Sequence, residues 1–113
     1  MASQVAMAFP VLPGKRTEIE TFAATLLGPR RAEYEASQAT VTSENWYLQA
    51  TPSGDMLIVH FEAADPAAVM ANLAVSEDPF DIWFKAQVAS LSGIDLTQPI
   101  GPLPECVFHW SRG

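Results

Sequence analysis

The length and composition of this chain narrow the classes of protein it can belong to. Its 113 residues are 49% hydrophobic and 17% charged, which excludes a disordered chain and fits one domain over residues 1–113. Thirteen acidic against six basic residues give a net charge of −7, the wrong sign for a nucleic-acid-binding protein. One cysteine, Cys106, excludes an intrachain disulfide, and no apolar run predicts a signal peptide or a membrane span, so we expect a cytoplasmic protein.

The first third of the chain predicts a strand followed by two helices. Residues 4–9 alternate in a strand pattern, and both faces are apolar, which is typical of a central strand. After Pro13 and Gly14, apolar residues recur at helical spacing and predict an amphipathic helix that packs on a sheet. Its stripe consists of Ile19, Phe22, Ala23, Leu26 and Leu27. A Gly-Pro pair then interrupts this helix, and we expect a short second helix over residues 30–37.

Two strand-like runs, residues 45–51 and 56–62, flank a turn-forming cluster and predict a β-hairpin. We expect its loop to centre on Ser53 and Gly54, so that the numbers of paired positions sum to 107. One face, which we expect to pack on helices, then pairs Trp46 with Phe61, Leu48 with Val59 and Ala50 with Leu57. The other face pairs Asn45 with Glu62, Tyr47 with His60, Gln49 with Ile58 and Thr51 with Met56.

The remaining elements are two helices and a strand. Asp65 and Asp78 each precede a proline, and this pattern predicts a helix start because the carboxylate can cap the first turn. The second of these helices has a dense apolar stripe and ends at Gly93. The stripe consists of Phe80, Trp83, Phe84, Val88 and Leu91. After a proline-rich surface crossing over residues 98–104, residues 106–110 predict a last short strand.

The order of these elements predicts a ferredoxin-like α+β sandwich with a four-stranded antiparallel sheet. Helices would cover one face of that sheet. The other face would carry Tyr47, Gln49, Ile58 and His60, and we expect it to be too apolar to stay in water in a monomer. The sequence therefore predicts a homodimer.

Several segments resemble the dimeric α+β barrel superfamily. LPGK at residues 12–15, after a first strand, is similar to the entry to the first helix in antibiotic-biosynthesis monooxygenase-like members. ENWYLQ, GDMLIVHFEA and SEDPFDIWFKAQ are more similar to a family of small bacterial proteins in this superfamily that has no assigned activity. The resemblance spans almost the whole chain. It implies two sheets closing face to face around a shared cavity, and it names no reaction.

The resemblance also bears on cofactors. Haem-degrading relatives use an asparagine on the first strand and an iron-ligating histidine on a helix, but residues 4–9 lack asparagine and both histidines lie in predicted strands. Cofactor-independent monooxygenase relatives use a tryptophan, tyrosine and asparagine cluster, which Asn45, Trp46 and Tyr47 superficially match. Adjacent strand residues point to opposite faces, so Trp46 belongs to the core. We expect neither a cofactor nor a metal.

One candidate site lies on the sheet face that the helices leave open. His60 suits proton transfer at neutral pH, and Tyr47 beside it can donate a hydrogen bond to a substrate oxygen, so both are candidate catalytic residues. The candidate ligand-binding residues are Gln49, Ile58, Glu62 and His109. Alternatively, His60 and Tyr47 bond to each other and fill a dimer core without any chemistry.

The sequence thus predicts a homodimer that binds or transforms a small organic molecule in a barrel cavity, as a cofactor-independent monooxygenase-like or isomerase-like enzyme would. The alternative is a non-catalytic dimeric binding or stress-response module whose barrel interior is packed solid. We expect neither nucleic acid nor a membrane as a partner. An open cavity with convergent polar groups would distinguish the two functions.

Overall fold

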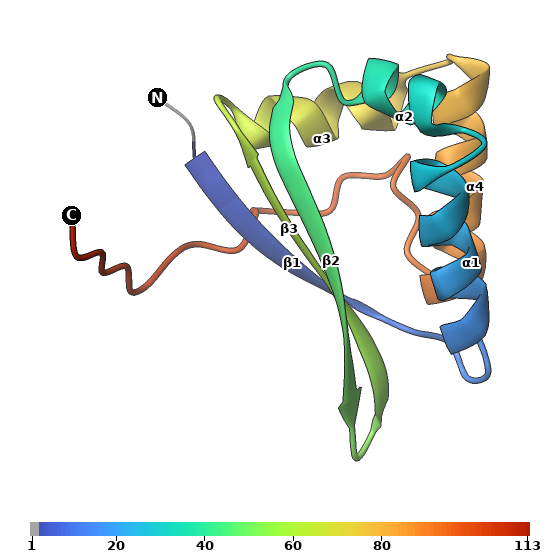
Figure 1. Cartoon of the computed structure of the whole chain (residues 1–113), viewed down its shortest axis with the longest axis horizontal. Helices are drawn as coiled ribbons and strands as arrows, with labels where there is room; N and C mark the ends of the chain where they lie inside the picture. The colour runs from blue at the N-terminus through green and yellow to red at the C-terminus, as the bar shows by residue number, and fades with distance from the viewer. Residues whose placement is uncertain (1–2) are drawn as a thin grey trace.

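The computed structural model describes residues 3–113, which form an α+β fold with three strands and four helices. The elements are β1 Ser3–Pro10, α1 Arg16–Leu27, α2 Arg31–Ser37, β2 Val41–Thr51, β3 Gly54–Ala63, α3 Pro66–Val75 and α4 Pro79–Ser92. The strands form one antiparallel sheet in the order β1-β3-β2, and the helices gather on one side of it (Figure 1). This arrangement is compatible with a ferredoxin-like fold. No helix among the described residues is long and apolar enough to cross a membrane.

The sheet has three strands within residues 3–113, so the prediction of four strands is wrong. Residues 106–110 are extended but lie outside the sheet, and Figure 1 shows this C-terminal segment running away from the helices. A strand requires a neighbouring backbone for its hydrogen bonds, and alternation in the sequence does not supply one. As a consequence β1 is an edge strand, and the prediction that it is central is also wrong.

The hairpin register differs from the predicted one by two positions. Thr51 pairs with Gly54 across a loop of Pro52 and Ser53, so the paired positions sum to 105. Gly54 has a φ of +124°, which glycine adopts without strain, and the Thr51 hydroxyl donates a 2.6 Å hydrogen bond to its carbonyl. The loop therefore lies one residue earlier in the chain than predicted.

Because the side-chain period of a strand is two residues, this shift changes partners but keeps every residue on its predicted face. Trp46 now lies opposite Val59, Tyr47 opposite Ile58, and His60 opposite Asn45.

The face toward the helices contains the hydrophobic core. Its aromatic centre joins three elements, because the ring of Phe22 in α1 lies 5.5 Å from Trp46 in β2 and 5.4 Å from Phe84 in α4. The predicted α1 stripe is confirmed at Ile19, Phe22 and Leu26, which are buried. It is wrong at Leu27, which is 64% exposed because it lies at the end of the helix, beyond the contact with the sheet.

Side-chain hydrogen bonds fix the ends of three helices. The predicted cap at Asp65 is confirmed, since its Oδ1 accepts a 3.1 Å hydrogen bond from the Ala68 amide. Asp78 makes no such bond. Instead Asp81, in the first turn of α4, accepts hydrogen bonds from Ser37 at 2.5 Å and from Ser76 at 2.6 Å, which ties the end of α2 to the segment after α3.

Buried Lys85 reinforces this connection between α3 and α4. Its Nζ donates to the carbonyls of Ala74 at 3.1 Å and Ser76 at 3.0 Å, at the C-terminal end of α3. A cation is favoured there because helix carbonyls point their negative ends toward it. These two bonds thereby fix α4 relative to the C-terminal end of α3.

Two neighbours on β3 test the assignment of faces. Phe61 is 3% exposed in the core, so Phe61→Ala should lower the free energy of unfolding by about 3 to 5 kcal/mol by leaving a cavity. The matched variant His60→Ala, on the open face, should lower it by only about 1 kcal/mol. Urea denaturation measures both values, and equal losses would contradict the assignment.

Candidate functional site

The structure places most of the predicted site residues together on the open face of the sheet. Tyr47, Gln49, Ile58, His60 and Glu62 all lie on the face turned away from the helices, with Tyr47 57% exposed and directly opposite Ile58. In contrast, His109 lies in the C-terminal segment outside the sheet and is exposed. The structure therefore does not bring His109 to the other five residues.

A hydrogen-bonded network connects the polar residues of this face. His60 Nε2 lies 3.2 Å from Oε1 of Gln4 on β1, whose Nε2 donates to Glu62 at 3.2 Å. Thr42 donates to the other oxygen of Glu62 at 2.9 Å. With the Gln4 amide in this orientation, Nε2 of His60 carries the proton. The partner of His60 is thus Gln4 and not the predicted Tyr47.

The open face carries almost no charge. Read from the paired registers, it consists of Gln4, Ala6, Ala8, Pro10, Ser43, Asn45, Tyr47, Gln49, Thr51, Met56, Ile58, His60 and Glu62. Glu62 is its single carboxylate, in a chain whose net charge is −7. The negative charge of the protein therefore lies mainly elsewhere.

A second group of polar residues lies on the helix side of the sheet, and the sequence reasoning missed it. A β-bulge between Val41 and Ser43 shifts the register of β2, after which Glu44 lies opposite Phe61 in the core-facing row. Oε2 of Glu44 accepts a 2.6 Å hydrogen bond from the indole Nε1 of Trp46. The phenol of Tyr34, on α2, lies near the same carboxyl group.

The surroundings of Glu44 favour its neutral form. Burial raises the pKa of Glu44 above its usual value, and the hydrogen bond from Trp46 and the nearby Tyr34 phenol only partly oppose this increase. Burial and the nearby Glu44 also raise the pKa of the Tyr34 phenol, so this side chain stays protonated. Burial thus shifts Glu44 toward its neutral form, beside the indole N–H of Trp46 and the phenol of Tyr34.

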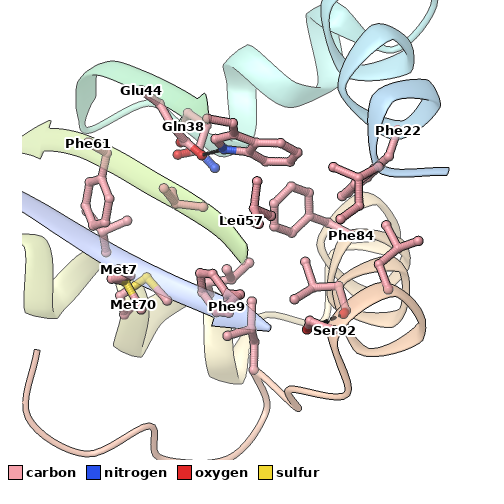
Figure 2. Close-up of a pocket in the computed structure, with 18 residues that line it drawn as sticks. Met7, Phe9, Phe22, Gln38, Glu44, Leu57, Phe61, Met70, Phe84 and Ser92 are labelled. Carbon is pink, nitrogen blue, oxygen red and sulfur yellow. Dashed lines mark hydrogen bonds between the residues drawn. The ribbon is translucent and has the colours of Figure 1, made fainter. Parts of the chain in front are cut away.

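This cluster lies at one end of a cavity of about 70 Å³ between the sheet and the helices. Figure 2 shows Glu44 and Gln38 at one end of the cavity and Ser92 at the other, with apolar side chains such as Met7, Phe9 and Leu57 between them. All three strands and three of the helices, α1, α3 and α4, contribute to its lining. The result is an apolar pocket with one ionisable group.

Glu44 could have been found from the sequence by parity. Residues 44, 46 and 48 alternate with the open-face residues, so a carboxylate shares a strand face with Trp46 and Leu48. The strand that the sequence predicts here covers residues 45–51 and so does not include Glu44. A carboxylate in an otherwise apolar row of side chains is the signal that was missed.

Comparisons with known proteins add no assignment. No family model matches the chain, and none of the curated proteins matches it either. Within residues 3–113, no group of three or more histidine, cysteine, aspartate or glutamate side chains could hold a metal ion.

The raised pKa of Glu44 predicts how stability depends on pH. Below about pH 4.3, the usual pKa of glutamate in an unfolded chain, Glu44 is protonated in both the folded and the unfolded protein. Above this pH the unfolded protein loses the proton first. The free energy of unfolding therefore falls as pH rises through the raised pKa of Glu44 in the folded protein. Each unit by which the pKa is raised removes about 1.4 kcal/mol of stability at high pH.

The variant Glu44→Gln lacks this loss because it cannot ionise. Its melting temperature relative to the wild type should therefore be higher at about pH 8 than at about pH 5. Scanning calorimetry at both pH values measures this difference in melting temperature. The variant Glu20→Gln, at an exposed position of α1, controls for the removal of one negative charge. A variant that is equally destabilised at both pH values would show that Glu44 is not held in its neutral form.

Proposed function

We propose that this chain forms a homodimer of the dimeric α+β barrel type, with ferredoxin-like protomers packed through their open sheet faces, and that it binds a small organic molecule between the two sheets. The observation that carries the proposal is the open face itself. All four helices gather on the opposite side, and this face presents Tyr47, Met56 and Ile58 (Figure 1). A small domain gains stability when such a surface leaves water.

The charge distribution favours a second copy of the same chain as the partner. Two protomers of net charge −7 repel each other over most of their surfaces. The open face contains Glu62 as its single carboxylate, so this repulsion is weak there. Two copies can approach through this face with little accumulation of like charge, and a C2 interface buries the same patch on both.

The C-terminal segment supplies further apolar surface for the same interface. Val107 is 87% exposed, Phe108 82% and Trp110 62%. Aromatic residues are enriched at the buried centres of protein interfaces. In the proposed dimer the second copy covers these side chains.

Within the dimer, the His60–Gln4–Glu62 network and the Tyr47 phenol are the polar groups available to a ligand. His60 can exchange a proton with the ligand, Tyr47 can donate to a ligand oxygen, and Gln49 and Ile58 border them. These contacts support ligand binding. If the protein is also an enzyme, we propose an isomerase-like or monooxygenase-like reaction. A solidly packed interior, as in a non-catalytic module, is the competing outcome.

Dimerisation is tested by placing a charge on the open face. Wild-type protein should sediment as two chains at low micromolar concentration, and Tyr47→Lys should weaken association by at least about tenfold because like charges would meet at the interface. Leu27→Lys adds the same charge at a position that is 64% exposed on the helix side and should leave the dimer intact. A well-folded wild-type monomer at tens of micromolar would refute the proposal.

Ligand binding between the sheets is tested with the neutral fluorescent probe N-phenyl-1-naphthylamine, which is too large for the cavity of about 70 Å³ beneath the sheet. The probe should bind the wild-type dimer with increased fluorescence, and His60→Ala should alter its affinity while the protein stays dimeric. Absence of probe binding to an intact dimer would favour a solidly packed interior.

A further inference from the structure

We propose that the two copies of the dimer exchange their C-terminal segments: residues 106–110 of each copy pair with β1 of the other copy and form a fourth strand there. Phe108 and Trp110 then fill a groove beside α3 of that copy, and His109 joins the open face that carries its His60. This inference rests on the proposed dimer, and it assigns to each copy a residue of the other copy's candidate site.

The edge of the sheet at β1 is free to accept another strand. β1 pairs with β3 along one side, and no backbone among the described residues pairs with its other side. Proteins protect such edges with charged side chains, prolines or bulges. β1 has no charged side chain and no bulge, and its one proline, Pro10, is its last residue. β2, at the opposite edge, has the bulge between Val41 and Ser43, so β1 is the unprotected edge.

Residues 106–110 have the properties of the strand that this edge lacks. They are extended, and within the described part of the chain no backbone group of residues 99–113 bonds to another backbone group. The side chains of Val107, Phe108 and Trp110 are exposed, and residues of these types favour strands. Addition to an open sheet edge would give partners to the backbone groups of both segments.

The direction of the C-terminal segment favours a second copy over the chain's own β1. Ile100 and Leu103 pack against the core, and beyond them Figure 1 shows the segment running away from the helices. In the proposed dimer the second copy lies on that side of the sheet. Neither β1 nor residues 106–110 contain an acidic or basic residue other than His109, so their contact adds little repulsion between two chains of net charge −7. Exchange of an identical segment is a low-cost route to a dimer.

A groove beside α3 has room for the aromatic side chains of this segment. The groove lies between α3 and residues 96–103 and has a volume of about 440 Å³. An apolar cavity of about 150 Å³ holds benzene, so this groove can take two aromatic rings. Its lining is apolar apart from Gln98, and it includes Ala67, Ala71, Ala74, Ile100 and Leu103.

The groove adjoins the helix side of β1. Met70 of α3 lines both this groove and the cavity beneath the sheet, and Met7 of β1 lines that cavity too. Helix α3 also contacts β1 directly. A strand added at the edge of β1 can therefore direct one row of its side chains into the groove.

The alternation of a strand then decides where His109 points. Phe108 and Trp110 share one face of residues 106–110, and His109 lies on the other. With the two aromatic rings in the groove, His109 lies on the open face. His60 is paired with Ala6 of β1, and neighbouring strands are about 4.8 Å apart, so the added strand lies about 10 Å from the strand of His60.

The exchange completes the candidate site with a residue from the other copy. Only the small exposed side chains of Ala6 and Ala8 lie on the open face of β1 between the two histidine-bearing strands. A ligand bound over them would meet His60 of one copy and His109 of the other, and one imidazole could donate a proton while the other accepts one. A single chain has only one of these two groups on its open face.

Disulfide cross-linking tests the exchange. In a Cys106→Ser background, one cysteine replaces Ala6 or Ala8 and a second replaces Val107 or His109, all at exposed positions. Residues opposite each other on paired strands have Cα atoms about 4.5 to 5.5 Å apart, which suits a disulfide. The four combinations cover three neighbouring registers. At least one of them should form a disulfide-linked dimer under mild oxidation, and peptide mapping should place the bond between β1 and the C-terminal segment.

The matched control moves the first cysteine to the helix side. Leu27→Cys, at a position that is 64% exposed, combined with the same cysteine at position 109, should form no such bond between the two positions. Sedimentation of each variant under reducing conditions measures dimerisation separately from the disulfide.

An NMR measurement on mixed dimers does not depend on the register of the added strand. One copy carries carbon-13 in its methionine methyl groups, and the other is unlabelled. The methyl group of Met70, which lines the groove, should show an NOE to the Trp110 indole of the unlabelled copy. Trp110→Ala in the unlabelled copy should remove this NOE.

Two outcomes would overturn the exchange, and they are distinguishable. A wild type that sediments as a dimer, with disulfides only within single chains or none at all and with no NOE between copies, would refute the exchange and leave the proposed dimer intact. A wild type that sediments as a monomer would refute the dimer and the exchange together.

Discussion

The interior of this protein depends on the indole of Trp46, whose ring lies in the core and whose N–H needs a hydrogen-bond acceptor there. Its ring packs 5.5 Å from Phe22 and 6.5 Å from Phe84, so the aromatic core joins β2 to α1 and α4 through this one side chain. An indole N–H in such a position must have an acceptor. Glu44 provides it at 2.6 Å. The partly apolar surroundings that make Trp46 a good core residue are the same surroundings that raise the pKa of Glu44.

Glu44 and Trp46 share a face by the ordinary alternation of a strand, whereas the backbone of β2 is irregular at its start. The bulge between Val41 and Ser43 lets Val41 pack against the core, and Glu44 and Trp46 then follow on the same side. In a regular strand, residues 41 and 44 would point to opposite faces. Bulges re-aim side chains in this way, often beside functional sites. One extra residue thus allows Val41 to share the core-facing side of β2 with Glu44 and Trp46.

The features that could be predicted from the sequence are those that depend on residues close together in the chain. The helix stripes of α1 and α4 and the face assignment of β3 depend on periodicity, and all three are confirmed, apart from Leu27 at the end of α1. The hairpin register depended on which residues form the turn, and Gly54 forms the last pair instead of lying within the loop. The place of residues 106–110 depends on a distant backbone partner, which no local pattern reveals. Glu44 was missed for a local reason, because the predicted strand begins at residue 45 although Glu44 shares the parity of Trp46 and Leu48.

The two candidate sites depend on the same register, since they lie on opposite faces of β2 and β3. A slip of β2 by one residue would move Trp46 and Glu44 into the open face and would turn Tyr47 toward the helices. Exposing a buried aromatic side chain costs about 1.5 to 3 kcal/mol, and the slip would expose several apolar groups at once. The Thr51–Gly54 turn at one end and the bulge at the other oppose such a slip. The elements that fix the register of β2 therefore hold both faces in place together.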